Sequence, residues 1–484
     1  MLRAALAVVA AGLLAASGAA APVPTTTYGA AGAQALSTLL DVYYAGNGLW
    51  NQCEQSACGA TDSDWGADSL TYALALRART AGDTSIPSVL AALTLAAPTY
   101  PAACRLPSCD SWSDVPEWDS IAASREYEVT HDPAALTKAE AAFGFVEGSD
   151  AFSLGACPDI RYQQPSGSIN QLKTLESDGN AVKAAILLFQ ATGDQKYLTS
   201  AVTRYAAIRA HFLDPAVPLY TVYVFDNGQT CTQVPHRFFA SVNGDMIWSG
   251  LELSKLTGTA SYLDEAVASA KAVVADLSDP AGVFADLQAE NDVVEPLVEG
   301  MYALATDGKQ AFARSWILTN AAAAVSARAP DGAFGRFFDG PAPQTIVTAW
   351  QTNGGLALEI AAAALDPRGV IRIVNPWVGA RRVARQLGPT GTLRFTGSEI
   401  ALIGTLGESC CEAGHARVSV DGRETFDGTG IWQDKSSSGR AIKGTVLFAW
   451  RWPRPGRHTI SFAPGVANGK EGGSFLHVRA YLVG

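Results

Sequence analysis

The feature that most constrains this fold is a helical segment that ends in a short polar turn and recurs up to residue 365. The stops follow apolar, alanine-rich runs at Gly82-Asp83, Asp132-Pro133, Gly193-Asp194, Thr257-Gly258 and Asp307-Gly308, and residues 356–365 form a sixth helix of this kind. Successive turns lie about 50 to 65 residues apart, which leaves room for two helices and their loops. One such hairpin cannot bury its apolar face alone, so six of them predict a closed (α/α)6 toroid over residues 22–366.

The pattern changes after Asp366-Pro367, where polar and apolar residues begin to alternate. Arg417-Val418-Ser419-Val420 and residues 459–462 and 476–480 have the period of strands, and Asp421-Gly422 and Pro455-Gly456 are turn signals between them. Several short strands with such turns favour a sandwich. The sequence therefore predicts an all-α toroid followed by a small all-β sandwich over residues 370–484.

The first 21 residues have the organisation of a signal peptide. Arg3 precedes an apolar run over residues 4–16, and a small-residue stretch at 17–21 suits signal peptidase. The apolar run is shorter than the roughly 20 residues of a membrane span, and no later segment reaches that length without charges or glycines. We expect a secreted, extracellular protein without a membrane span, whose mature chain begins near Ala20.

Eight cysteines in an exported chain indicate disulfides. Cys53 and Cys58 have the same spacing as Cys104 and Cys109, and Cys157 and Cys231 are the natural third pair. The adjacent Cys410 and Cys411 form either a strained vicinal disulfide or two separately used thiols. A zinc site would need CxxC or histidine spacings that the sequence lacks, so we expect no metal and no cofactor.

Charge is divided unevenly along the chain. From Gly369 onward there are 15 Lys and Arg against eight Asp and Glu, which leaves 20 against 38 before that point. Binding to nucleic acid needs a basic footprint on the working domain, so the acidic first region argues against such a partner. The basic tail serves either to attract the acidic region or to touch an anionic envelope polymer.

The residues that precede each inner helix of the predicted toroid are consistently polar, with tryptophans close by. In chain order they are Asp62, Asp64 and Trp65; Asp114, Glu117 and Trp118; Glu176 and Asp178; Asn243, Asp245 and Trp248; Asn291 and Asp292; and Trp350, Gln351 and Asn353. Any one of them is more often a helix cap than a ligand. Together, carboxylates, amides and indoles match a sugar, whose hydroxyls take hydrogen bonds and whose ring stacks on an aromatic side chain.

The segment from Asp114 to Pro133, DVPEWDSIAASREYEVTHDP, resembles glycoside hydrolase family 76, the α-1,6-mannanases. The family pattern is Asp-Asp-x-x-Trp, then Arg-x-Tyr before a Thr-Gly-Asp turn, and Asp114, Trp118, Arg125 and Tyr127 fall in step with it. Further similar pieces are Lys173 and Ser177, Asn243-Gly244, and residues 331–335 with 339–341. The resemblance covers about Thr27 to Leu365 and implies a six-hairpin glycosidase scaffold.

One position departs from that family. The family uses two adjacent aspartates, a nucleophile and a general acid/base, and the second is Val115 here. A glycosidase needs two carboxyl groups, about 5 to 5.5 Å apart in retaining and about 6.5 to 9.5 Å apart in inverting enzymes. Glu117, at i+3 from Asp114, is our first choice for the second carboxyl group. The other options are Asp64, Glu176, Asp178 and Asp245.

These observations predict a secreted glycoside hydrolase that acts on an α-linked polysaccharide, mannan-like or another envelope, plant or fungal glycan, with Asp114 and Glu117 catalytic. The predicted sugar-binding residues are Asp64, Trp65, Trp118, Glu176, Asp178, Asn243, Asp245, Trp248 and Trp350. We expect a monomer whose partner is a poly- or oligosaccharide. The alternatives are a glycan-binding protein on a glycosidase scaffold and a polysaccharide lyase or epimerase.

The β domain has two interpretations of equal weight. Its pattern resembles the carbohydrate-binding sandwiches appended to secreted glycosidases, so that Trp432, Trp450 and Trp452 stack on sugar. The other interpretation is that Trp450 and Trp452, two apart on a strand, pack in the core or against the toroid.

Overall fold

A computed structural model describes most of the chain. The described residues are 23–54, 59, 61–62, 65–100, 112–147, 155–162, 172–235, 237–285, 293–344, 346–387, 390–406, 415–424, 431–432, 442–464 and 478–484. The predicted signal peptide lies outside them, as do Asp64, Asn291, Asp292, Cys58, Cys104, Cys109, Cys410 and Cys411.

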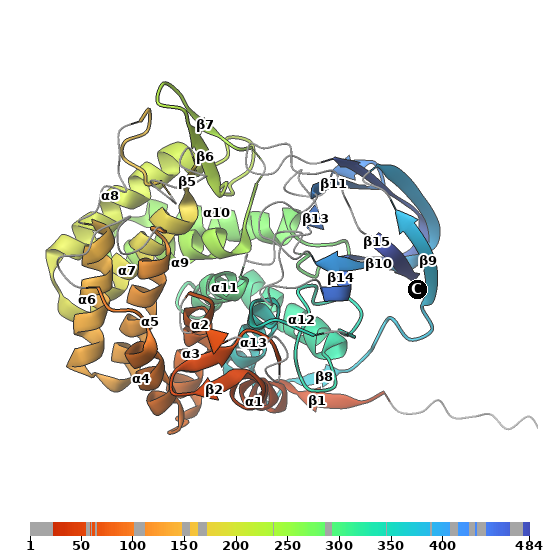
Figure 1. Ribbon diagram of the computed structural model, residues 1–484, viewed down its shortest axis with the longest axis horizontal. Coiled ribbons are helices and arrows are strands. Elements are labelled where there is room, and N and C mark those ends of the chain that lie inside the picture. The colour runs from red at the N-terminus through yellow and green to blue at the C-terminus, as the bar shows by residue number, and fades with distance from the viewer. Residues whose placement is uncertain are drawn as a thin grey trace, which may run out of the picture.

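Six buried helices contact one another in a closed order. They are α3 (Thr71–Ala81), α5 (Val115–Thr130), α7 (Leu175–Thr192), α9 (Ala240–Thr257), α11 (Glu295–Thr306) and α13 (Ala349–Leu365). Each contacts the next, and α13 contacts α3. A short α2 (Trp65–Asp68) leads into α3. The first region is therefore built around a ring of inner helices (Figure 1).

A second set of helices packs outside this ring. It comprises α1 (Tyr28–Thr38), α4 (Ile86–Ala96), α6 (Pro133–Glu147), α8 (Gln195–Phe212), α10 (Ala260–Asp276) and α12 (Ala311–Ala327), with a π-helical turn at Leu39–Tyr43 after α1. Each outer helix contacts one or two inner helices and keeps an exposed face. No helix in the described part of the chain is long and apolar enough to cross a membrane.

The repeated stops of the sequence lie at the ends of the inner helices. Gly82, Gly193 and Gly258 follow α3, α7 and α9 in the left-handed conformation, where glycine carries no Cβ penalty. His131 takes the same conformation after α5, at φ 56°. The helical period predicted from these stops is confirmed.

The second region is a curved antiparallel sheet of seven strands. These are β9 (Arg381–Leu387), β10 (Gly391–Leu406), β11 (His415–Val420), β12 (Arg423–Glu424), β13 (Ile431–Trp432), β14 (Ile442–Pro464) and β15 (Val478–Val483). The order is β12-β11-β14-β10-β15-β9, with β13 also beside β11. A separate β region is confirmed. Where the sequence predicts a sandwich, strands β9 to β15 form one hydrogen-bonded sheet. The pairing of the long β10 and β14 contains three register shifts, which let this sheet bend.

Three small sheets complete the fold. Strands β2 (Tyr44–Gly46), β3 (Leu49–Asn51) and β4 (Thr61–Asp62) pair near α2, and β5 (Leu172–Thr174), β6 (Tyr223–Asp226) and β7 (Cys231–Gln233) pair at the start of α7. The third joins β1 (Thr25–Thr27) to β8 (Val370–Arg372), so the first described strand pairs with a strand beyond the helical region.

The two regions share an apolar and hydrogen-bonded contact. The rings of Phe337 and Phe448 lie 6.5 Å apart. The Trp377 indole donates to the Asp339 carbonyl at 2.9 Å, and the Arg451 backbone N–H donates to Asp279 at 3.1 Å. Burial, reinforced by the nearby Asp279 carboxyl group, raises the pKa of Asp339 well above its usual range.

The closest helix packing in the ring gives a prediction on stability. A Cβ on Gly244 of α9 would overlap the backbone of Pro296 and Leu297 in α11, whereas a Cβ on Gly144 of α6 would meet nothing. We expect Gly244→Ala to cost about 1 to 3 kcal/mol of unfolding free energy. Gly144→Ala, on an exposed helix face, should stabilise by about 0.5 to 1 kcal/mol. Thermal unfolding of both variants checks this, and equal melting temperatures would contradict the packing described.

Candidate active site

Asp114 stands at the end of the ring where α5 begins. Its carbonyl accepts the N–H groups of Glu117 and Trp118, both at 3.1 Å, while its partly exposed side chain does not cap the helix. Ser113 is held beside it by Ser177 of α7, with the two hydroxyl oxygens 2.5 Å apart. The positive end of the α5 dipole favours an anionic Asp114 at this position.

Glu117 and Asp178 are buried beneath this end of the ring, in contact with arginines. Arg161 forms ion pairs with Glu117 and Glu147, and its backbone N–H donates to Asp178 at 3.0 Å. Arg204 lies 3.2 Å from Asp178 and 2.5 Å from Glu147. Glu117 and Arg161 are both 0% exposed. This cluster joins α5, α6, α7 and α8 to the loop that carries Arg161.

The ion pair of Glu117 bears on its predicted role. A guanidinium in contact favours the ionised carboxylate, whereas a general acid must carry a proton. In this conformation Glu117 serves to neutralise a buried arginine. Its role as the second catalytic carboxyl group stays a prediction that this pairing does not favour, and the same holds for sugar binding by Asp178.

A second ionic cluster occupies the centre of the ring. Lys183 of α7 lies 2.9 Å from Asp245 of α9 and 2.5 Å from Glu299 of α11, and Arg125 of α5 pairs with Glu299. All four side chains are at most 3% exposed. Glu295, one turn before Glu299, is buried at the start of α11.

The protonation states in this cluster balance its charge. Although burial opposes it, Arg125 and Lys183 lower the pKa of Glu299. Burial raises the pKa of Asp245, an effect that Lys183 opposes. Burial raises the pKa of Glu295 to about 8, with Lys183 opposing and Glu299 reinforcing the change. At neutral pH Glu295 is therefore a neutral acid, and two cations face two carboxylates.

The amides predicted at the rim hold the loops together. Asn243 accepts the N–H of Tyr220 at 2.9 Å and donates to the carbonyls of Tyr220 and Phe239. Asn353 of α13 accepts the N–H of Glu295 at 2.9 Å. Both amides position the starts of inner helices, and sugar binding by Asn243 stays a prediction.

The four rim tryptophans fall into two groups. Trp118 and Trp248 are buried at 6% and 7% exposure, and Trp248 lies under the Lys183 ammonium group, 5.7 Å from the ring centre. Trp65 and Trp350 are partly exposed and stack on each other, with ring centres 4.7 Å apart and an angle of 23° between the planes. The second pair offers an aromatic surface to a ligand.

Glu176 lies in the first turn of α7 and is partly exposed. The Thr174 hydroxyl accepts its backbone N–H at 3.1 Å and lies 3.3 Å from its carboxylate. Its predicted role in sugar binding is compatible with this position but is not tested by it.

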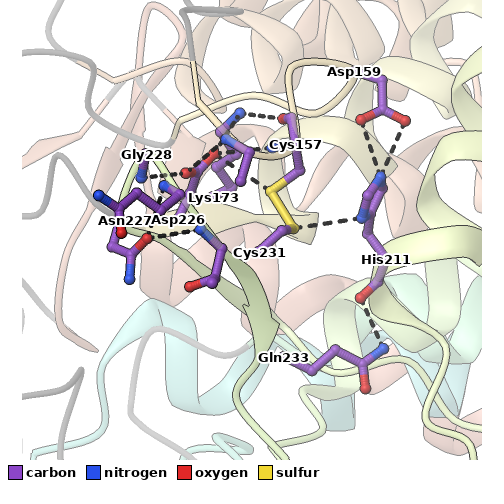
Figure 2. Close-up of a disulfide and its surroundings, with 12 residues drawn as sticks. Cys157, Asp159, Lys173, His211, Asp226, Asn227, Gly228, Cys231 and Gln233 are labelled. Atoms are coloured by element: carbon purple, nitrogen blue, oxygen red, sulfur yellow. Dashed lines mark hydrogen bonds and ion pairs between the residues drawn. A yellow bond between two sulfur atoms is a disulfide. The ribbon is translucent and has the colours of Figure 1, made fainter.

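A disulfide supports the loops in front of α7 and α9. Cys157 and Cys231 are bonded, with their Cα atoms 5.7 Å apart, which confirms the predicted third pair. Asp226 accepts the backbone N–H groups of Ala156 and Cys157, and the buried Lys173 ammonium lies 3.3 Å from it (Figure 2). Cys53 is also disulfide-bonded.

The same region contains the one close group of metal-binding residue types in the described part of the chain. It consists of Cys157, Cys231 and His211, whose Nδ1 lies 3.5 Å from the Cys231 sulfur (Figure 2). Zinc binds cysteine as the thiolate, and both sulfurs are used in the disulfide. This group is therefore unsuited to a metal.

Glu54 and Asp331 form a pair of interacting carboxyl groups near the start of α13 that sequence patterns do not reveal. Burial and a hydrogen bond with Asp331 raise the pKa of Glu54 to about 8. Both residues line a shallow pocket of about 470 Å³. Asp331 belongs to a family-like motif, but nothing in the sequence pairs it with Glu54, which lies nearly three hundred residues earlier.

Comparisons with known proteins place this geometry on a known scaffold. No family model and no curated protein matches the chain. Among solved structures, it is similar to the GH76A α-1,6-mannanase of Salegentibacter sp. HEL1_6, with a TM-score of 0.60 and 22% identity over 70% of this chain and 99% of that one. The chain has a glycoside hydrolase family 76-like scaffold.

Two further family 76 structures agree. An inactive variant of the Salegentibacter enzyme, with two adjacent aspartates replaced by alanine, is bound to α-1,6-mannotetrose and has a TM-score of 0.60 at 21% identity, over 70% of this chain and 99% of that one. A family 76 mannosidase from Bacteroides thetaiotaomicron VPI-5482 has a TM-score of 0.60 at 16% identity, over 70% of this chain and 98% of that one. At these identities the likeness concerns the fold.

The raised pKa of Glu295 predicts a pH-dependent stability. The folded state keeps Glu295 protonated up to about pH 8, whereas the unfolded chain ionises near pH 4.5. The contribution of protonated Glu295 to the free energy of unfolding is therefore complete below pH 4.5 and is lost as the pH rises through 8. The free energy of unfolding falls by at most about 1.4 kcal/mol per pH unit in this range. Glu295→Gln cannot ionise, so we expect its melting temperature to rise relative to the wild type between pH 5 and 9. A difference independent of pH would rule out a protonated Glu295.

Proposed function

We propose that this chain is an exported glycoside hydrolase that cleaves an α-linked, mannan-like polysaccharide at the end of the helical ring where the inner helices begin. The observation that carries the proposal is the position of Asp114, a partly exposed carboxylate at the start of α5 on a family 76-like scaffold. The predicted signal peptide and the disulfides support an extracellular location.

Asp114 would act as the nucleophile or as the base. Hydrolysis also needs a group that protonates the leaving oxygen, and such a group must be protonated at the working pH. Glu117 is the predicted acid, and reaching that role requires release from Arg161. Glu295 already carries a proton near neutral pH and lies at the start of α11 on the inside of the ring. Its protonation state therefore suits the task.

Substrate binding would use the partly exposed aromatic pair. Trp65 and Trp350 present an indole surface close to the starts of α3 and α13. The C–H face of a hexose stacks on such a surface, while its hydroxyl groups take hydrogen bonds from neighbouring polar side chains. Glu176, a partly exposed acid in the first turn of α7, is a candidate for such bonds.

The alternative is a glycan-binding protein that has lost catalysis. Val115 favours it, because the inactive Salegentibacter variant lacks two adjacent aspartates and this chain has only one of two such residues. A lyase or epimerase is the second alternative, and an unsaturated product that absorbs ultraviolet light would reveal a lyase. A hydrolysis and binding panel of mannans, arabinans and glucans separates the three.

Replacing the proposed nucleophile gives the direct test. We expect Asp114→Asn to lower hydrolysis of α-1,6-mannan at least about 100-fold, because the amide can neither attack nor accept a proton. Reducing-sugar release measures this. Asp132→Asn, in the exposed turn at the opposite end of α5, is the control and should retain activity. Unchanged hydrolysis in Asp114→Asn would show that another residue is the nucleophile.

Val115 offers a gain-of-function test. Val115→Asp restores two adjacent carboxyl groups, and we expect it to raise mannan hydrolysis about tenfold or more if the missing acid limits the rate. The asparagine of Val115→Asn has nearly the same size and polarity as the aspartate of Val115→Asp but cannot transfer the proton. Val115→Asn should therefore show no gain in hydrolysis. Equal rates in both variants would mean that the wild-type chain already supplies its acid from elsewhere.

A further inference from the structure

A groove lies where the helical region meets the β region. Its volume is about 630 Å³, within the range of about 300 to 1,000 Å³ typical of ligand clefts. One wall is formed by residues near the start of α9 and the end of α10, including Phe238 and Ser278. The other wall is formed by the turn after β11 and by Trp450 and Trp452 of β14. The groove therefore exists only when both regions are present.

The β wall carries a row of aromatic side chains on one face of β14. Phe448, Trp450 and Trp452 alternate along the strand and so point to the same side. Phe448 packs against Phe337 of the helical region. The rings of Phe448 and Trp450 are parallel, with their centres 5.9 Å apart. Trp452 stacks on His458 at 3.8 Å. The row of aromatic side chains therefore extends from the buried contact between Phe448 and Phe337 to the groove, which Trp450 and Trp452 line.

Two buried polar atoms at this groove have no hydrogen-bond partner within the described residues. They are the indole Nε1 of Trp450 and the hydroxyl of Ser278. Trp452 differs, because its indole donates to Asp421 at 3.2 Å. A buried donor without a partner costs about 1 to 3 kcal/mol, and a ligand with hydroxyl groups would recover that cost.

The charges of the groove select a neutral ligand. The groove is lined by a single cation, Arg423, and by four acidic residues, Asp276, Asp279, Asp421 and Glu424. Arg423 lies 3.6 Å from Asp276 across the two walls. The Arg423 side chain is 83% exposed, so this ion pair is weak. An anionic ligand would meet a net negative surface. Carboxylates that accept hydroxyl hydrogen bonds, beside tryptophans, suit a sugar.

The groove opens at the same end of the molecule as Asp114. Phe238 directly precedes the N-cap of α9, and Asn243 of α9 holds the backbone of Tyr220 close to Val217, which also lines the groove. The end of α10 lies here because α10 packs on α9 after a tight turn at Gly258. A polysaccharide could run from the inner-helix starts into the groove.

We propose that the junction groove is a second binding site for a neutral polysaccharide, which extends the proposed substrate-binding surface at the inner-helix starts into the β region. This inference rests on the proposed substrate class. It makes Trp450 and Ser278 polar contacts for sugar hydroxyl groups and Trp452 part of the aromatic wall.

The test measures binding of linear α-1,6-mannan by affinity electrophoresis, with the full chain in the Asp114→Asn background. Ala275 is exposed, lines the groove and lies near the end of α10, so Ala275→Trp fills the groove without disturbing a buried residue. Ser261→Trp, exposed at the other end of α10, is the matched control. We expect Ala275→Trp to bind mannan about tenfold more weakly than Ser261→Trp.

Two milder variants test the polar contacts. Trp450→Phe keeps an aromatic ring but removes the indole N–H, and Ser278→Ala removes the hydroxyl; each should weaken binding about three- to tenfold. Thermal unfolding of each variant shows that the fold is kept. If all three groove variants bind mannan as tightly as Ser261→Trp, the inference is overturned.

Mannan hydrolysis by the wild-type chain distinguishes a failure of the groove inference from a failure of the proposed glycosidase function. Cleavage of mannan with no effect of the groove variants on binding overturns the groove and leaves the glycosidase. Binding that depends on the groove, without cleavage by the wild type, supports the groove and overturns the glycosidase. A chain that neither binds nor cleaves mannan overturns both.

Discussion

Two cations buried at the centre of the helical ring, Arg125 and Lys183, are the constraint on which the inner helices depend. Each must be paired, because an unpaired buried charge costs several kcal/mol. The partners Asp245 and Glu299 come from α9 and α11, while the cations come from α5 and α7. The pairs therefore fix how four inner helices are rotated relative to one another. They also fill the floor of the ring beneath the helix starts, where a substrate would approach Asp114.

The helical period could be predicted from the sequence because its signals are local. A glycine after an apolar run, as at Gly193 and Gly258, ends a helix whatever surrounds it. The β region was recognised by its alternation, but not its single sheet, because the register shifts near Gly397 and Gly404 depend on strands far away in the sequence. Cys157 and Cys231 were paired correctly across 74 residues because the remaining cysteines suggested other pairings.

The site was less predictable, since its chemistry depends on contacts between distant segments. Asp114 was identified from its motif and its place before a helix. Nothing near Glu117 reveals that Arg161, 44 residues later, neutralises it. Asn243 appeared as a sugar ligand because it begins an inner helix, and the structure shows its amide bonded to the backbone. The spacing of Glu295 and Glu299 places them one turn apart on a helix, but the raised pKa of Glu295 arises mainly from burial, which the sequence does not show.

The pairing of β1 with β8 has a consequence for the order of folding. Thr25 lies opposite Arg372, and the N–H groups of Tyr28 and Gly29 donate to the carbonyls of Gly369 and Pro367. The first helix therefore meets its partner α13 only when nearly three quarters of the chain has been made. Such long-range contacts form slowly because a long loop must close first. The ring is therefore completed late in folding. A chain that is translocated across a membrane in the unfolded state would have β1 and β8 on the same side of that membrane before the two strands pair.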